Sequence, residues 1–115
     1  MVEKRFSNKI VVITGATRGI GLACAERFAL EGAKICTIQR GKSELFDSIQ
    51  CDLSKEQECS NSIETIIEKY GRIDVLINNA GMMMESSIKD TSIEDWNQTL
   101  AVNLTAPFLL SKLTM

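Results

Sequence analysis

The sequence predicts an α/β fold, with a doubly wound parallel sheet of about four strands and helices flanking it. Three observations support this prediction. Short apolar runs rich in β-branched residues alternate with segments of helical periodicity, and the connections between them are short. The first apolar run is continuous, which is typical of a strand buried on both faces. That run is followed at once by a glycine-rich turn and a helical segment, over residues 9–21.

The first predicted strand covers residues 10–13, and the turn after it leads into the first helix. Apolar residues recur through that helix at the spacing of a helix face. The expected face consists of Ile20, Ala23, Cys24 and Phe28. Because a helix begins at this turn, its free backbone N–H groups and positive dipole end are expected to form a diphosphate cradle.

The glycines of this turn follow the pattern Gly-x-x-x-Gly-x-Gly, at Gly15, Gly19 and Gly21. The pattern differs from the Gly-x-Gly-x-x-Gly of the common dinucleotide motif and from the P-loop. Three glycines also occur in turns that have only a structural role, and a flavin or a nucleoside phosphate would suit the same cradle. The buried strand before the turn and the amphipathic helix after it favour the nucleotide.

Later segments continue the alternation of strand and helix. Three further strands are expected, at Lys34–Ile38, Leu45–Gln50 and Ile73–Ile77. Ser54 and Gln57 have the spacing of a capping box, and Gly71 ends the helix that follows them. No repeat or linker interrupts this order, so we expect parallel strands joined by right-handed crossovers.

The last part of the chain is expected to form a loop and one helix. The loop covers Met82–Asp90, and Thr91 or Ser92 caps a helix that begins near Glu94. This helix is apolar on nearly every side, and Pro107 is expected to interrupt it.

Polar or glycine-rich clusters follow each of the four predicted strands. They are Gly15, Gln39 with Arg40, Asp52, and Asn78–Gly81. Because the carboxyl ends of parallel strands meet at one edge of a sheet, these clusters are expected to converge on a single ligand site.

The composition excludes several classes of function. The net charge of the 115 residues is −2, which does not indicate nucleic-acid binding, and no apolar run is long enough to span a membrane. The absence of histidine removes imidazole as a catalytic base or metal ligand. The four cysteines show no C-x-x-C pairing, which favours reduced thiols in a cytoplasmic protein and no metal site.

Four segments together resemble the short-chain dehydrogenase/reductase (SDR) family. Thr14–Gly21 is similar to its cofactor motif, and Cys51–Leu53 is similar to its adenine-contact segment. Asn78–Gly81 matches its hallmark tetrapeptide, and Val102–Leu104 resembles the segment that carries a catalytic asparagine. The resemblance implies a Rossmann-type fold and covers nearly the whole chain.

The resemblance also implies roles for individual residues. Asp52 would accept a hydrogen bond from the adenine amino group, with Leu53 beside it. The catalytic residue would be Asn103, which holds a water molecule of a proton relay in the family. The remaining cofactor-binding residues would be Gly15, Ala16, Thr17, Arg18, Gly19, Ile20, Gly21, Arg40, Asn79, Ala80 and Gly81.

The charges near the second strand indicate NADP, with NAD as the alternative. An acid after this strand normally accepts from the ribose 2′-hydroxyl of NAD, and Gln39 stands there instead. Arg40 and Arg18 could bind a 2′-phosphate through charge-assisted hydrogen bonds. The alternative is that both arginines are solvated surface residues.

Part of the family's chemistry is missing from this sequence. The family needs a catalytic serine and a Tyr-x-x-x-Lys pair, whereas Tyr70 has Asp74 four residues on. Residues 1–115 are therefore expected to be an incomplete NAD(P)-binding Rossmann domain, the N-terminal part of an oxidoreductase, with no turnover of its own. A non-catalytic nucleotide-binding protein, a redox sensor and an unrelated flavodoxin-like domain are the alternatives.

The expected partners of the parent protein are a small carbonyl or alcohol substrate and further copies of itself. A 3-oxoacyl thioester and a sugar or other alcohol are both compatible substrates. In the family the last helix packs against a partner subunit, so its outward apolar residues suit a homo-oligomer, either a dimer or a tetramer. We expect neither nucleic acid nor membrane as a partner.

Overall fold

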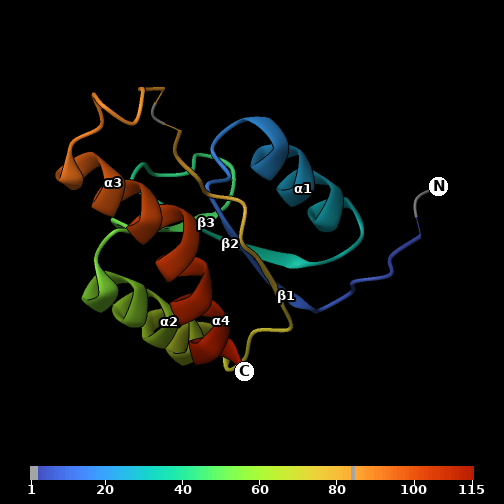
Figure 1. Ribbon diagram of the computed structural model, residues 1–115. Helices are drawn as coiled ribbons and strands as arrows, with labels where there is room; N and C mark the ends of the chain where they lie inside the picture. The colour runs from blue at the N-terminus through green and yellow to red at the C-terminus, as the bar shows by residue number, and fades with distance from the viewer. Residues whose placement is uncertain (1–2, 84) are drawn as a thin grey trace.

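One parallel sheet organises the computed structural model, which describes residues 3–83 and 85–115 (Figure 1). The strand order is β3-β2-β1-β4, and every neighbouring pair is parallel. The strands are β1 (Ile10–Thr14), β2 (Lys34–Gln39), β3 (Asp47–Gln50) and β4 (Val75–Ile77). The predicted α/β class and parallel sheet are therefore confirmed.

The β1 strand is buried along its whole length and supplies core residues to both faces of the sheet. Successive side chains of a strand point to opposite faces. Val12 joins the cluster under one face, and Val11 and Ile13 join the cluster under the other. In register, Val12 lies between Cys36 of β2 and Leu76 of β4.

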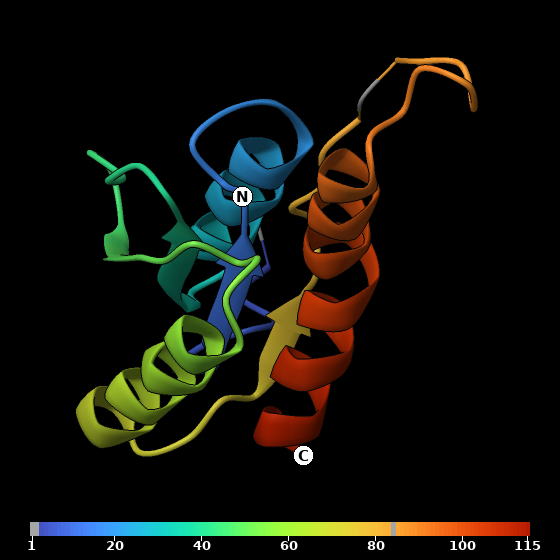
Figure 2. The ribbon, with the colours of Figure 1, turned by 60° about the vertical axis from the view of Figure 1, so that its left-hand side comes forward.

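Helices cover both faces of the sheet, as Figures 1 and 2 show. On one face lies α1 (Gly19–Leu30), and on the other lie α2 (Glu56–Tyr70) and α4 (Ala106–Thr114). The α2 helix ends at Gly71, whose φ of 84° is the left-handed conformation that glycine adopts without strain. Prediction and structure agree on this helix stop.

The buried face of α1 differs from the predicted one. Ile20 is 76% exposed, and the buried residues of the helix are Gly21 and Ala25. Cys24 and Phe28 pack against the cluster as expected. Compared with the predicted orientation, α1 is rotated about its axis, so that Gly21 and not Ile20 faces the sheet. Its first turn lies close against the turn after β1, where only glycine fits at position 21.

The predicted capping box at the start of α2 is wrong. Lys55 is the residue that precedes the helix, and the Ser54 hydroxyl donates to Asp52 Oδ1 at 2.7 Å instead. The Gln57 amide donates to Asn61 Oδ1 at 2.9 Å. The helix begins one residue later than a box at Ser54 and Gln57 requires, and the Ser54 hydroxyl is instead held by the Asp52 carboxylate.

Two strands are shorter than predicted at their N-terminal ends. The β3 strand begins at Asp47, and Leu45 before it is 67% exposed. The β4 strand begins at Val75, after Asp74 has accepted a hydrogen bond from the Ile10 amide at 2.7 Å. The Ile10 amide thus donates to the side chain of Asp74, and not to the backbone carbonyl of an additional β4 residue.

The last helix begins where it was predicted to, after a loop at Met82–Asp90 of which residue 84 lies outside the described part. Ser92 Oγ accepts from the Asp95 amide at 3.0 Å and caps α3 (Ile93–Leu100). The α-helical pattern is interrupted just before Pro107, as expected, by η1 (Ala101–Thr105), a π-helical turn, and the helix then continues as α4.

The wider turn accommodates the proline. In η1 the Ala106 amide bonds to the Ala101 carbonyl five residues earlier, as in a π-helix. Pro107 has no N–H to donate and stands in the first turn of α4, where the missing donor costs least.

The segment before β1 is tied to the end of α1. The Arg5 guanidinium binds both carboxylate oxygens of Glu31, and Arg27 Nε donates to Glu31 at 2.8 Å. The rings of Phe6 and Phe28 meet edge to face with 4.8 Å between centroids. These contacts fix the entry of the chain into the sheet.

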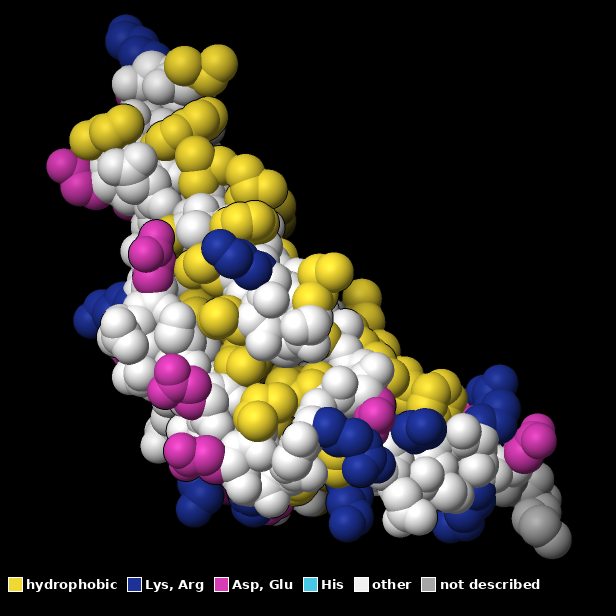
Figure 3. Space-filling view, turned by 90° about the horizontal axis from the view of Figure 1, so that it is seen from below, with side chains coloured by type: hydrophobic (Ala, Val, Ile, Leu, Met, Phe, Trp, Pro, Cys, Tyr) yellow, Lys and Arg dark blue, Asp and Glu magenta, His cyan; other side chains and the backbone are white. Residues whose placement is uncertain are grey.

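Large apolar side chains remain exposed along α3, η1 and α4. They include Ile93, Trp96, Leu100, Leu104, Phe108 and Leu113. Seen from below, hydrophobic side chains form a long band on the molecular surface (Figure 3). Among the described residues β4 pairs with β1 alone, so one edge of the sheet is also open.

Candidate functional site

The turn after β1 needs glycine at two positions because of backbone conformation. Gly15 has φ +66° and Gly19 has φ +62°, both in the left-handed region. The Gly15 amide donates to the Ile38 carbonyl of β2 at 2.9 Å, which fixes the turn over the sheet. The space where a Gly19 side chain would stand is open, so the backbone is accessible there.

A third glycine is needed for close packing rather than for its φ angle. A Cβ on Gly21 would stand 2.2 Å from the Gly15 carbonyl oxygen and 2.5 Å from Asn79 Nδ2. Contacts this short do not occur between real atoms, so only glycine fits. The first turn of α1 therefore lies directly against the β1 turn.

The segment after β4 is held against the same turn. Thr14 Oγ1 accepts hydrogen bonds from the backbone amides of Asn79 at 3.0 Å and Ala80 at 2.9 Å. The Asn79 side chain donates to the Gly15 carbonyl at 2.8 Å. Two motifs more than sixty residues apart in sequence thus form one structural unit.

A cavity of about 570 Å³ opens at this edge of the sheet. Its wall combines the glycine turn with the segments that follow β2, β3 and β4, which is the predicted convergence. The site residues that line it are Gly15, Thr17, Arg18, Gly19, Arg40, Asp52, Leu53, Asn79, Ala80 and Gly81.

Four of the predicted site residues lie outside the cavity wall. Ala16 is fully buried beneath the turn, and Gly21 is buried against Gly15. Ile20 is exposed at the start of α1. Asn103 stands in η1 and reaches the site through the loop at Met82.

Gln39 has a structural role that sequence reasoning did not predict. Its side chain is buried, and its Oε1 accepts from the Ala16 amide at 3.3 Å. Its Nε2 donates to Thr37 Oγ1 and to the Gly41 carbonyl, each at 3.0 Å. Gln39 therefore connects the end of β2 to the glycine turn, a role that residue type and position alone do not indicate.

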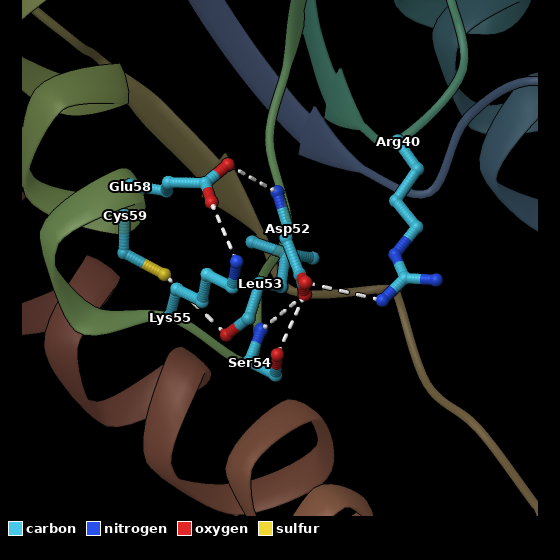
Figure 4. Close-up of polar contacts among 7 residues, drawn as sticks. All are labelled: Arg40, Asp52, Leu53, Ser54, Lys55, Glu58 and Cys59. Atoms are coloured by element: carbon cyan, nitrogen blue, oxygen red, sulfur yellow. Dashed lines mark hydrogen bonds and ion pairs between the residues drawn. The ribbon is translucent and has the colours of Figure 1, made fainter.

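Arg40 and Asp52 form an ion pair on the cavity wall (Figure 4). Arg40 Nη2 donates to Asp52 Oδ2 at 3.1 Å. The other carboxylate oxygen accepts from the amide of Ser54 at 3.0 Å and from its hydroxyl at 2.7 Å. The hydrogen bond from Ser54 is the main cause that lowers the pKa of Asp52, so the carboxylate stays ionised at neutral pH.

Asn103 makes a two-point contact with the backbone of the loop after β4. Its Oδ1 accepts from the Met82 amide at 2.8 Å, and its Nδ2 donates to the Met82 carbonyl at 2.7 Å. The side chain thereby positions the loop at the cavity wall, where Met82 is also found.

The cysteines do not form disulfides with one another, and three of the four are buried. Burial raises the pKa of the Cys36 thiol to about 11, which makes it a poor nucleophile at neutral pH. Cys51 lines the cavity beside Asp52. Within the described ranges, no three His, Cys, Asp or Glu side chains are grouped so that they could bind a metal ion.

Residues 9–115 match a protein-family model described as short chain dehydrogenase. This match covers the whole sheet, the glycine turn and the Asn79 segment. The chain belongs to the short-chain dehydrogenase family. The resemblance seen in the sequence motifs is thereby confirmed.

Individual members of the short-chain dehydrogenase family are similar along nearly the whole chain. An uncharacterized oxidoreductase of Thermotoga maritima is 41% identical, with 93% of this chain and 47% of that protein aligned. An NADP-dependent (R)-specific alcohol dehydrogenase of Lentilactobacillus kefiri is 33% identical over 95% of this chain and 48% of its own. Ligand-free aldohexose dehydrogenase of Thermoplasma acidophilum superposes with a TM-score of 0.91 at 35% identity, covering 98% of this chain and 45% of that chain.

The chain thus spans about half the length of the curated relatives it matches. The superposition supports the assignment of the four-stranded sheet as a Rossmann-like part of the short-chain dehydrogenase fold. In the part of the chain that the structure describes, every helix is too short or too polar to cross a membrane.

Proposed function

We propose that this chain is the cofactor-binding part of an NADP(H)-dependent oxidoreductase, which transfers a hydride between NADPH and a carbonyl or alcohol. The observation that carries the proposal is the single cavity whose wall combines the glycine turn, two arginines, Asp52 and the Asn79–Gly81 segment. The cavity is large enough for a substantial part of a dinucleotide at about 570 Å³. Membership in the short-chain dehydrogenase family supports the same function.

The residues present fit the parts of the cofactor. The left-handed turn at Gly15 and Gly19, with open space at Gly19, allows a diphosphate to approach the backbone. Arg18, which precedes α1, makes no side-chain cap, so the first amides of the helix remain available as donors. The fixed Asp52 carboxylate is an acceptor for the adenine amino group, with Leu53 beside it.

Residues 79–81 border the cavity at the place proposed for the ribose, and Ala16, Ile20 and Gly21 support the diphosphate turn from outside the wall. The bound cofactor supplies or accepts the hydride. Asn103 is proposed as the catalytic residue of this chain, as the family resemblance implies, and its contact with the Met82 backbone at the cavity wall supports the proposal.

The charge at the cavity wall favours NADP over NAD. Gln39 stands where an acid would accept from a ribose 2′-hydroxyl, and its side chain is engaged by Ala16, Thr37 and Gly41. Arg18 and Arg40 both line the cavity and can bind a 2′-phosphate. The Lentilactobacillus kefiri relative is an NADP-dependent alcohol dehydrogenase, which supports this choice.

The catalytic serine and the Tyr-x-x-x-Lys pair are proposed to lie in a further part of the protein, because the sequence has neither. The one tyrosine, Tyr70, donates to Asp47 at the opposite edge of the sheet from the cavity. Substrate binding is assigned to the same further part, and a 3-oxoacyl thioester and a sugar or other alcohol both remain candidates. Assembly as a dimer or tetramer through α3 and α4 belongs to the same proposal.

Coenzyme kinetics of the full-length protein test the proposal. We expect a higher kcat/KM with NADPH than with NADH, and Arg40→Gln should reduce the ratio of the two by about tenfold, since a charge-assisted hydrogen bond is lost. Lys34→Gln changes an exposed cation at the start of β2, away from the cavity, and should leave the ratio unchanged. A wild-type preference for NADH would contradict the coenzyme assignment.

A non-catalytic nucleotide-binding protein or redox sensor is the second candidate, favoured by the missing Tyr-x-x-x-Lys pair. Reading the gene beyond the codon for Met115 distinguishes the two. A downstream serine and Tyr-x-x-x-Lys would support the oxidoreductase, and a stop codon would support the second candidate.

A further inference from the structure

Arg40 already has an anionic partner on the cavity wall. Its guanidinium donates to Asp52 at 3.1 Å, and no other acceptor for it is found within the described residues. In Figure 4 the two side chains approach from different segments, Arg40 from the end of β2 and Asp52 from the segment after β3. A phosphate that binds Arg40 through Nη2 therefore takes the place of a carboxylate rather than of water.

The carboxylate is the fixed member of this pair. Besides the two hydrogen bonds from Ser54, the Asp52 amide donates to Glu58 Oε1 at 2.9 Å. The Asp52 side chain is 22% exposed, whereas that of Arg40 is 72% exposed. Since this contact is the one that anchors the head group of Arg40 in the described chain, the guanidinium can turn to another anion while the Asp52 carboxylate stays in place.

We propose that Asp52 competes with the 2′-phosphate of the cofactor for Arg40 and so limits the preference of the site for NADP. The inference rests on the proposed function and adds a specificity-determining role to the residue proposed to bind adenine. A cofactor without the 2′-phosphate leaves the ion pair intact. A cofactor with it draws Nη2 of Arg40 away from Asp52, and the loss of that contact weakens binding of that cofactor only.

Substitution of Asp52 by asparagine separates the charge from the shape of the side chain. Asparagine retains Oδ1, which accepts from Ser54, but it carries no charge to hold Arg40. Loss of the adenine acceptor charge affects nucleotides with and without a 2′-phosphate alike. The ratio of their dissociation constants therefore reports the competition for Arg40.

The test measures binding of adenosine 2′,5′-bisphosphate and of 5′-AMP to the full-length protein by calorimetry. Asp52→Asn should raise the ratio of the 5′-AMP Kd to the bisphosphate Kd by about threefold to fivefold, the range expected for a pair of exposed charges. Arg40→Gln should lower the ratio. In the Arg40→Gln background, Asp52→Asn should change the ratio by less than about 1.5-fold, since the competition acts through Arg40.

Asp47→Asn is the matched control. Asp47 is also an aspartate paired with a cation, Lys69 at 2.9 Å, but it lies at the start of β3 and outside the cavity wall. This variant should leave the ratio unchanged. Asp52→Ser is a second substitution that removes the charge, and it should change the ratio in the same direction if Asp52→Asn does not fold.

An unchanged or lowered ratio in both Asp52 variants would overturn the inference. An increase of equal size with and without Arg40 would also overturn it, because the carboxylate would then repel the phosphate directly. Failure of the wild-type protein to bind either nucleotide would instead contradict the proposed function, and the inference with it. The wild-type measurement alone separates these two failures.

Discussion

The glycine turn after β1 and the helical rod of α3, η1 and α4 contrast in how they hold their motif residues. At the turn, Thr14 and Ala16 are buried, and Gly21 has no room for a side chain. On the rod, Asn103 is exposed and is held by the Met82 backbone alone among the described residues. Large apolar side chains such as Phe108, at 62% exposure, stand beside it without cover in the described chain.

The difference shows which part of the site is structurally complete. The cavity wall is built by contacts between the glycine turn and the segments after β2, β3 and β4, so its geometry is set within this chain. The rod buries Ala106 and Leu110 against the sheet but leaves its other side open. The proposed oligomer would cover this apolar surface.

The largest expected effect comes from filling the close approach in the turn. Gly21→Ala places a methyl group 2.2 Å from the Gly15 carbonyl oxygen, so backbone must move. We expect a loss of about 2–4 kcal/mol in the free energy of unfolding, as for severe overpacking of a core. Urea unfolding of the full-length protein measures it.

Gly41→Ala is the control for this substitution, because no atom lies within 4 Å of the position of its Cβ. Its stability should remain within about 0.5 kcal/mol of the wild type. Equal stability of the two variants would show that the turn and α1 are not closely packed, and the contrast with the rod would be lost.

An intermediate effect is expected on the rod, where association should change and folding should not. Phe108→Glu places a charge on the exposed apolar face of α4. We expect the Kd of the oligomer to rise by at least about tenfold, because burying such a side chain contributes roughly 1.5–3 kcal/mol. Sedimentation over a range of concentrations measures the Kd.

Leu45→Glu is the matched substitution, since Leu45 is 67% exposed but lies before β3, far from the rod in sequence. It should leave association unchanged. A monomeric wild-type protein at all concentrations would contradict the oligomer proposal.

The smallest effect is expected where the N-terminal segment meets α1. Hydrogen bonds from Arg5 and then Arg27 lower the pKa of Glu31 from its ordinary 4.5 to about 2. A carboxyl group with a lowered pKa stabilises the fold fully above pH 4.5, and this stabilisation is lost as the pH falls towards 2. Glu31→Gln should therefore be less stable than the wild type at pH 7, with the difference narrowing between these two pH values.

Thermal unfolding at a series of pH values measures this effect, with Glu26→Gln, an exposed acid of the same helix, as the control. A stability difference that stays constant down to pH 2 would show that the ion pairs with Arg5 and Arg27 do not set the pKa.

Sequence reasoning succeeded where periodicity and strand order decide the structure. The continuous apolar run at Ile10–Ile13 predicted a strand buried on both faces, and the rule for parallel sheets predicted that Gly15, Arg40 and Asp52 meet at one edge. Both predictions depend only on the order and spacing of residue types along the chain, and not on which side chains meet after folding.

Several polar contacts were missed for a different reason, which is competition between polar partners in space. Ser54 has the spacing of a helix cap but donates to Asp52, and Gln39 at the end of β2 stands in the place of an acceptor for the cofactor but binds the turn. The ion pair between Arg40 and Asp52 joins residues of two segments twelve positions apart. Such choices depend on which acceptor lies nearest after folding, and no local pattern encodes them.

The π-helical turn at Ala101–Thr105 changes the angular phase of the rod. An α-helix turns by about 100° per residue, so one residue accommodated in a wider turn rotates everything after it relative to an uninterrupted helix. The residues of α3 are all at least partly exposed, whereas after the turn Ala106 and Leu110 face the core. The turn therefore changes which face of the helix points to the sheet. One continuous rod can then place Asn103 at the cavity loop and Leu110 against the sheet.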